Sequence, residues 1–333
     1  MKLTTDQIRS ITNGALYVRE ENGFTVLSRF TDVQKEYYRL SSEKNPSNGF
    51  FRKSYASSGI RLEFVTDSDM LAFCYCSTHA SSRRFYYFDI FVDGVMVEHF
   101  GRENVAEDEG VFSMALPAGE HTVCLYLPCL AEAKLFNFTL SDGAFFRPVE
   151  RKLKLLCYGD SITQGYDAKY PSQTYANLLA DKLGAEMVDQ GIGGEHFCPG
   201  LIAEDIPFAP DIITVAYGTN DWSNQEPDLT VERANAFYKG LRERYPEAKI
   251  FAITPIWRGD NHRVTKIGTF EQGRDVVRNA ARAAGVTAVI EGNGLVAHIP
   301  EAFAPDCLHP IDFGFKFYAN ALYDAMLPYL EVK

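Results

Sequence analysis

The sequence predicts an α/β chain in two parts, an all-β sandwich or jelly roll over residues 1–148 and a domain with a parallel sheet over residues 149–333. Two observations lead to this prediction. A chain of 333 residues is long enough for about two domains of roughly 150 residues each. The pattern of apolar residues also changes near residue 148, from short runs between turns to strands that alternate with helices.

The first part consists of short predicted strands separated by turns. Residues 59–65 alternate apolar and charged side chains, and residues 84–92 are rich in aromatic and β-branched types. Asp93-Gly94 is a hairpin signal before a strand over residues 95–100. No helical period is convincing here, which favours a purely β part. Further strands are expected over residues 110–116, 121–127 and 134–140.

In the second part, strands and helices alternate from residue 152 onward. Such alternation predicts a parallel sheet that helices cover on both faces. Ligands of these sheets bind beyond the carboxyl ends of the strands. The predicted strands cover residues 154–158, 186–189, 211–217, 249–254 and 286–290, and the helices cover 172–183, 230–244, 270–284 and 315–327.

Composition excludes several classes of partner. The chain has 44 acidic and 33 basic side chains and a formal net charge of −11, so we expect neither nucleic acid nor an anionic membrane as a partner. No apolar run approaches the ~20 residues that cross a bilayer, and the N-terminus lacks a signal-peptide core, so we expect a cytoplasmic protein. Seven cysteines without a C-x-x-C pair indicate reduced thiols rather than disulfides or a zinc site.

The predicted strand ends carry polar and glycine-rich segments. The first strand leads into Gly159-Asp160-Ser161, a turn that can present a serine hydroxyl or backbone N–H groups. By itself this turn is equally compatible with phosphate binding or helix capping. The second strand ends in Gly191-Ile-Gly193-Gly194, and the third ends in Gly218-Thr-Asn220-Asp221. Glycine N–H groups and a carboxamide can both donate to a developing negative charge.

A histidine and an aspartate precede the final predicted helix. In Asp306-Cys-Leu-His309 the carboxylate can accept a hydrogen bond from one ring nitrogen and leave the other free as a base. The four segments follow one another at one edge of the predicted sheet. Together they supply a nucleophile, oxyanion donors, a base and its orienting acid, which favours catalysis over simple chain turning.

The four segments resemble the conserved blocks of the SGNH, or GDSL-type, hydrolases, over residues 152–330. The resemblance implies a flavodoxin-like three-layer α/β/α domain and ester hydrolysis through an acyl-enzyme. It assigns Ser161 as the nucleophile, Asp306 and His309 as the rest of the triad, and the Ser161 N–H, Gly194 and Asn220 as oxyanion donors. The second block usually opens with asparagine, and this chain has Asp189 there, so the choice between Gly193 and Gly194 stays open.

A β-sandwich before such a domain also resembles the two-domain carbohydrate esterases that remove acetyl groups from sugars. We therefore expect a serine esterase for short-chain, acetyl esters of a small molecule or oligosaccharide, with no cofactor and no metal. Trp222, Trp257 and Arg258 lie at predicted strand ends and are candidates for substrate binding. Alternatives are a lipase, lysophospholipase or thioesterase of the same family, and, from other classes, a noncatalytic carbohydrate-binding protein or a flavin- or phosphate-binding protein.

Other reactive side chains are weaker candidates. Cys307 would need a base of its own to act as a nucleophile, and His298 has no aspartate three residues before it. The segments 195–196 and 260–262 contain histidine beside an acidic residue or near one, without the paired spacing of a zinc site.

Overall fold

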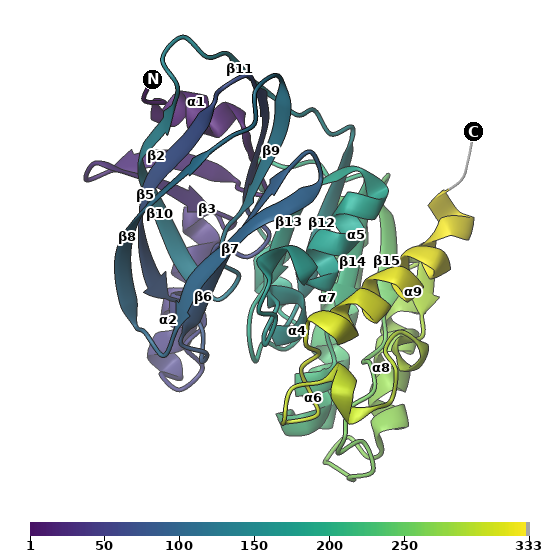
Figure 1. The fold of residues 1–333 in the computed structure, drawn as a ribbon. Coiled ribbons are helices and arrows are strands. Elements are labelled where there is room, and N and C mark those ends of the chain that lie inside the picture. The colour runs from purple at the N-terminus through teal and green to yellow at the C-terminus, as the bar shows by residue number, and fades with distance from the viewer. Residues whose placement is uncertain (331–333) are drawn as a thin grey trace.

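The computed structural model describes residues 1–330 and confirms the predicted fold class. Two antiparallel sheets face each other in the N-terminal part, and a five-stranded parallel sheet between helices forms the C-terminal part (Figure 1). The last antiparallel strand ends at Pro148 and the first parallel strand begins at Leu153. The division between residues 148 and 149 as separate domains stays our proposal.

Within each N-terminal sheet, a tight turn joins two neighbouring strands that are consecutive in the chain. Asp93 and Gly94 both have positive φ, of 50° and 78°, as the predicted two-residue hairpin requires. One sheet has the order β1-β4-β9-β6-β7 with β11 paired to β4, and the other has the order β2-β3-β10-β5-β8. Their strands are β1 (Thr12–Asn13), β2 (Tyr17–Glu21), β3 (Phe24–Ser28), β4 (Arg61–Thr66), β5 (Met70–His79), β6 (Phe85–Val92), β7 (Val95–Glu103), β8 (Glu107–Ala115), β9 (His121–Tyr126), β10 (Ala131–Leu140) and β11 (Phe146–Pro148).

The core of the sandwich lies between the two sheets and is rich in aromatic rings. Phe73 on β5 packs against Phe88 on β6 with ring centroids 6.1 Å apart, and Phe88 stacks on Phe100 of β7 at 4.9 Å. Leu62, Leu125 and other apolar side chains from both sheets complete the same cluster. Alternating residues of each strand thus face inward, as the alternating pattern of the sequence predicts.

The N-terminal part is not purely β, because it also contains α1 (Thr5–Ser10), α2 (Asp32–Lys44) and α3 (Phe50–Lys53). The expectation that helices are absent here was wrong. Helix α2 begins with a capping box in which Thr31 and Gln34 exchange side-chain and backbone hydrogen bonds. It buries Gln34 and Tyr38 against the C-terminal part, whereas its apolar residues Val33 and Leu40 are exposed. The buried positions therefore form no apolar period that could be found in the sequence.

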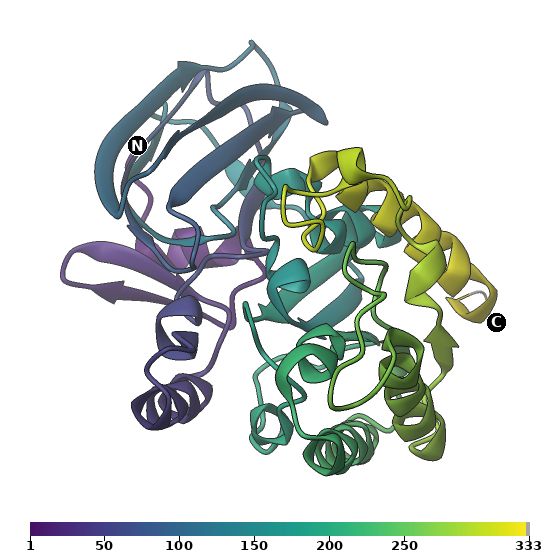
Figure 2. The same cartoon turned by 90° about the horizontal axis from the view of Figure 1, so that it is seen from below.

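The C-terminal sheet has the order β13-β12-β14-β15-β16 with all strands parallel, the flavodoxin-like order. Helices α5 and α9 pack on one face, and α7 and α8 pack on the other (Figure 2). The strands are β12 (Leu153–Gly159), β13 (Ala185–Gly191), β14 (Ile212–Ala216), β15 (Lys249–Ile253) and β16 (Ala288–Ile290). The α-helices are α4 (Ser161–Gln164), α5 (Tyr175–Leu183), α6 (Thr219–Asn224), α7 (Pro227–Arg244), α8 (Phe270–Ala283) and α9 (Asp312–Leu330), with 3₁₀ turns η1 (Pro171–Gln173), η2 (Pro199–Ile202), η3 (Gly292–Gly294) and η4 (Pro300–Ala302).

Arg29, between β3 and α2, connects the two parts. Its side chain is 0% exposed and donates hydrogen bonds to Ala56 O at 2.8 Å and Lys53 O at 3.2 Å in the N-terminal part. It also donates to Asp189 O at 2.7 Å and Gly191 O at 2.8 Å at the end of β13. One buried guanidinium therefore satisfies carbonyl groups on both sides of the interface.

Among residues 1–330, none of the helices has the length and apolar character that a bilayer crossing demands.

Candidate active site

The strand-end segments meet because their strands are neighbours in the sheet. Gly159 at the end of β12 lies opposite Gly191 on β13 and opposite Ala216 on β14. The polar residues that follow these three strands therefore converge at the carboxyl edge of the sheet. His309 reaches the same edge from the loop before α9.

Ser161 is the first residue of the short helix α4. Asp160 caps this helix by accepting the Ile162 N–H at 3.0 Å, and burial raises the pKa of Asp160 to about 6. A Cβ at position 159 would lie 2.0 Å from Thr163 Oγ1, so glycine is required for this tight turn. The Ser161 N–H has no hydrogen-bond partner among residues 1–330. It remains free for a ligand, as expected at a helix N-terminus.

Ser161, His309 and Asp306 form a continuous chain of hydrogen bonds. His309 Nε2 lies 2.8 Å from Ser161 Oγ, and His309 Nδ1 lies 2.6 Å from Asp306 Oδ2. Asp306 Oδ1 also accepts the N–H groups of Leu308 at 3.0 Å and His309 at 3.1 Å. Burial opposes ionisation of Asp306, but these hydrogen bonds outweigh it and hold its pKa well below the usual range. An ionised Asp306 requires the proton on Nδ1 and leaves Nε2 as the acceptor for the serine hydroxyl.

A second carboxylate and an arginine flank the histidine, and sequence reasoning missed both. Asp167 Oδ2 lies 3.6 Å from His309 Nδ1. Arg83, from the loop between β5 and β6, donates to both oxygens of Asp167 at 2.8 and 2.6 Å and lies 3.3 Å from Asp306 Oδ2. Asp167, Asp306 and His309 are close enough to hold a metal ion. Arg83 and His309 already donate hydrogen bonds to the carboxylates of Asp167 and Asp306, so these three residues fit a hydrogen-bonded cluster better than a metal site.

The segment of residues 191–194, called the glycine block below, presents one N–H group without a partner among the described residues. The Gly193 N–H donates to Gln164 Oε1 at 2.8 Å, whereas the Gly194 N–H has no partner within the described part of the chain. Gly194 has a φ of +83°, which a residue with a side chain rarely adopts. Asn220 Nδ2 donates one proton to Glu195 O at 3.0 Å and keeps a second proton for another acceptor. Of the two glycines, Gly194 is therefore the one whose N–H is free to donate to a ligand.

Asp189 stands where the family usually has asparagine, and the surrounding residues suit a carboxyl group. Asp189 Oδ1 accepts the Gly191 N–H at 2.7 Å and lies 3.7 Å from Arg29 Nη1. Burial raises the pKa of Asp189 to about 7, against the opposing charge of Arg29. The backbone hydrogen bond that shapes the glycine block is therefore present despite the departure from the family pattern.

The three candidates for substrate binding occupy different positions. Trp222 is 1% exposed and donates from Nε1 to Gly268 O at 3.0 Å, so it is a packing residue with no surface for a substrate. Arg258 is also buried and donates to Thr219 Oγ1 at 3.0 Å. Trp257 is partly exposed and stacks on His298, with ring centroids 5.4 Å apart. The position of these three residues in the sequence was enough to predict which edge of the sheet they lie at. It did not predict that the Trp222 and Arg258 side chains point into the protein interior.

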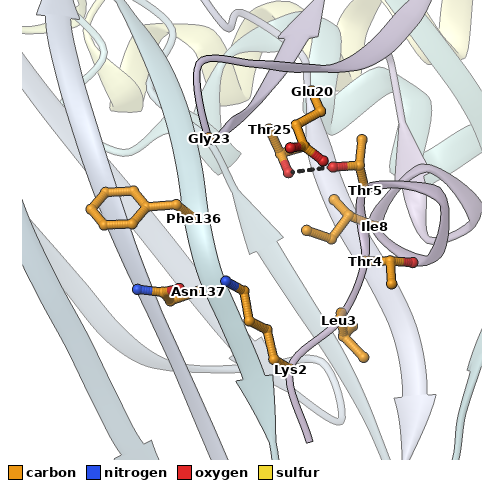
Figure 3. A pocket seen from close by; sticks show the side chains of 10 residues that line it. All are labelled: Lys2, Leu3, Thr4, Thr5, Ile8, Glu20, Gly23, Thr25, Phe136 and Asn137. Atoms are coloured by element: carbon orange, nitrogen blue, oxygen red, sulfur yellow. Dashed lines mark hydrogen bonds between the residues drawn. The ribbon is translucent and has the colours of Figure 1, made fainter.

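The weaker candidates do not join the hydrogen-bonded chain. Cys307 has a φ of +49°, and its carbonyl accepts the Gly259 N–H. His298 Nε2 lies 2.6 Å from Asn293 O, away from Ser161. A separate cavity of about 380 Å³ lies in the N-terminal part between α1, the β2–β3 hairpin and β10 (Figure 3). Its lining residues include Glu20 and Phe136 and none of the four blocks.

Comparison with known proteins finds a family model that matches the C-terminal part of the chain. Residues 157–316 match the model of the GDSL-like lipase/acylhydrolase family. No curated protein matches the sequence. A salicylyl-acyltransferase from a tetracycline biosynthetic pathway is 23% identical, with a TM-score of 0.78 over 97% of this chain and 96% of that one.

Two further solved structures share the fold over the same length. A putative GDSL-like lipase from Bacteroides ovatus is 20% identical, with a TM-score of 0.74 over 98% of this chain and 97% of its own. An acetyl xylan esterase from the rumen bacterium Butyrivibrio proteoclasticus is 18% identical, with a TM-score of 0.62 over 97% of this chain and 96% of its own. The C-terminal part of this chain is a GDSL-like lipase/acylhydrolase domain, and the chain is a carboxylic ester hydrolase.

Proposed function

We propose that this chain removes acetyl or other short acyl groups from a carbohydrate, through an acyl-enzyme on Ser161. The observation that carries the proposal is the hydrogen-bonded chain from Ser161 through His309 to Asp306. The acetyl xylan esterase of the same two-part fold supports a carbohydrate ester as the substrate. An acidic chain, with a net charge of −11, suits a neutral ester better than an anionic lipid surface.

In the proposed first half-reaction, Ser161 Oγ attacks the ester carbonyl carbon while His309 Nε2 takes the hydroxyl proton. The carbonyl oxygen becomes an oxyanion, which accepts hydrogen bonds from the Ser161 and Gly194 N–H groups and from Asn220 Nδ2. When the intermediate collapses, the bond from carbon to the sugar oxygen breaks, and His309 returns its proton to that oxygen.

In the second half-reaction, water attacks the acyl-enzyme and His309 takes a proton from it. Collapse of this intermediate breaks the bond to Ser161 Oγ, which recovers its proton, and the free carboxylic acid leaves. Asp306 stays ionised throughout and stabilises the imidazolium form of His309.

Replacement of the nucleophile tests this assignment. We expect Ser161→Ala to lower kcat on a short fluorogenic ester by about 10⁴-fold or more, and Ser113→Ala, at an exposed position on β8, to leave kcat unchanged. A phosphonate should label the wild-type enzyme on the peptide that contains Ser161. Substantial activity of Ser161→Ala, or labelling elsewhere, would refute the assignment.

The acyl group is tested with a series of esters of increasing chain length and with acetylated oligosaccharides. We expect the highest kcat/KM for acetyl esters. A preference for chains of eight or more carbons would overturn the short-chain proposal in favour of a lipase.

A second candidate, transfer of the acyl group to an alcohol other than water, is favoured by the similarity to the salicylyl-acyltransferase. The same acyl-enzyme serves both reactions, because only the group that attacks it differs. Added sugar alcohols would divert the acyl group into a new ester if transfer dominates. Release of free acid alone would identify hydrolysis.

A further inference from the structure

A buried lysine of the N-terminal part lies directly against the glycine block. Lys53, the last residue of α3, is 9% exposed. Its Nζ donates to Gly193 O at 2.6 Å and to Asn48 O at 2.8 Å. Lys53 has no ion-pair partner in the described residues. Its ammonium group contacts these two carbonyl oxygens and lies 5.5 Å from the centroid of the Phe50 ring.

The carbonyl that Lys53 contacts belongs to the same peptide unit as the free N–H of Gly194. A positive charge at the oxygen of a peptide group draws electron density away from its N–H and strengthens that group as a donor. The ammonium also fixes the plane of the peptide unit. The preceding unit is fixed separately, because the Gly193 N–H donates to Gln164.

We propose that Lys53 is a positioning residue of the oxyanion hole, whose ammonium group orients and polarises the peptide between Gly193 and Gly194. The inference rests on the proposed acyl-enzyme mechanism, in which the Gly194 N–H donates to the oxyanion. Lys53 itself does not touch the substrate. Its effect appears only when negative charge develops on the carbonyl oxygen, so it lowers the barrier rather than improving substrate binding.

A purely structural role would not require a charge at this position. Burial disfavours the charged form of Lys53 and, together with the positive charge of Arg52, lowers the pKa of Lys53 to about 8. The negative charge of Glu195 acts in the other direction. A neutral side chain would avoid this desolvation cost. The other nearby charge is Arg29, which donates to the main-chain oxygen of Lys53.

The first experiment compares Lys53→Met with the wild type, and uses Lys35→Met as a matched control. Lys35 is a half-buried lysine on α2 that lies over the Tyr55 ring, away from the glycine block. Titration with a phosphonate gives the fraction of molecules whose Ser161 reacts, and kcat is divided by that fraction. This correction separates a slower active site from a smaller folded population.

We expect Lys53→Met to lower the corrected kcat by about 10- to 100-fold, less than or similar to the loss of a whole oxyanion donor. KM should stay within about threefold, and the phosphonate should react more slowly with the same final stoichiometry. Lys35→Met should match the wild type. An unchanged corrected kcat in Lys53→Met would overturn the proposal.

The pH dependence gives a second test that does not need the methionine variant to fold. The wild-type kcat should fall as the pH rises through about 8, because Lys53 then loses its charge. Lys53→Arg keeps its charge and should lose this fall, whereas Glu195→Gln should retain it at a lower pH, because the Glu195 carboxylate no longer raises the pKa of Lys53. A fall that persists in Lys53→Arg, or one that disappears in Glu195→Gln, would contradict the proposal. A wild-type enzyme that neither hydrolyses esters nor reacts with phosphonate would instead refute the proposed function.

Discussion

Replacement of Arg29 by methionine should destabilise the chain more than any surface change. The substitution keeps much of the side-chain volume but removes four hydrogen bonds, to Ala56, Lys53, Asp189 and Gly191. A buried acceptor left without a partner costs about 1–3 kcal/mol. We therefore expect a loss of at least about 4 kcal/mol of unfolding free energy, since Arg29 is fully buried and water cannot replace it without rearrangement.

Urea unfolding measures this loss in each part of the chain. Both tryptophans lie in the C-terminal part, so their fluorescence follows the unfolding of that part, while far-ultraviolet circular dichroism follows the whole chain. We expect the fluorescence midpoint to fall strongly in Arg29→Met. Arg19→Met removes an exposed ion pair with Asp32 and should cost about 1 kcal/mol or less. A loss in Arg29→Met no larger than in this control would refute the reasoning.

Three further predictions concern charge around the active site. Asp306→Asn should lower kcat by about 10³- to 10⁴-fold with a stable fold, because an amide no longer holds His309 with its proton on Nδ1; steady-state kinetics and thermal unfolding check both statements, and a loss below tenfold would contradict this role. Arg83→Gln leaves two carboxylates beside His309 without their cation, so the acid limb of the kcat/KM profile should move to higher pH, while Arg84→Gln, at an exposed position, should leave it in place. Burial raises the pKa of Glu195 to about 8, so the contribution of Glu195 to stability is complete below pH ~4 and is lost as the pH rises through 8. The Tm of Glu195→Gln should therefore rise relative to the Tm of the wild type between pH 5 and pH 9. A difference between the two Tm values that stays constant with pH would show that Glu195 does not titrate in this range.

The sequence was most informative where a general property of parallel sheets brings distant segments together. Parallel strands place their carboxyl ends at one edge, so the order of strands along the chain was enough to predict that Ser161, the glycine block and Asn220 lie close together. The loop that carries His309 follows the last strand of the same sheet. The contact between Asp306 and His309 could be predicted from their spacing alone, because residues three apart in a turn can contact each other.

Of the residues that sequence reasoning missed, Asp167 lies in the α/β part itself, whereas Arg83 and Lys53 come from the other part of the chain. Arg83 is 223 residues from Asp306, and Lys53 is 140 residues from Gly193. No local pattern links such pairs, because the contact depends on how the sandwich packs against the α/β part. Only the capping box of Thr31 and Gln34 offered a local signal, for helix α2, whose apolar residues show no clear helical period.

The contacts of Lys53 and Arg29 also limit how the enzyme can move. Hydrogen bonds weaken steeply with distance and angle, so even a small hinge motion between the two parts would release the Gly193 carbonyl and the end of β13 together. A chain opened at this interface would lose the alignment of the peptide between Gly193 and Gly194, which we propose donates to the oxyanion. The chemical steps must therefore take place while the two parts are closed on each other, so the packing of the sandwich against the α/β part is a condition for turnover.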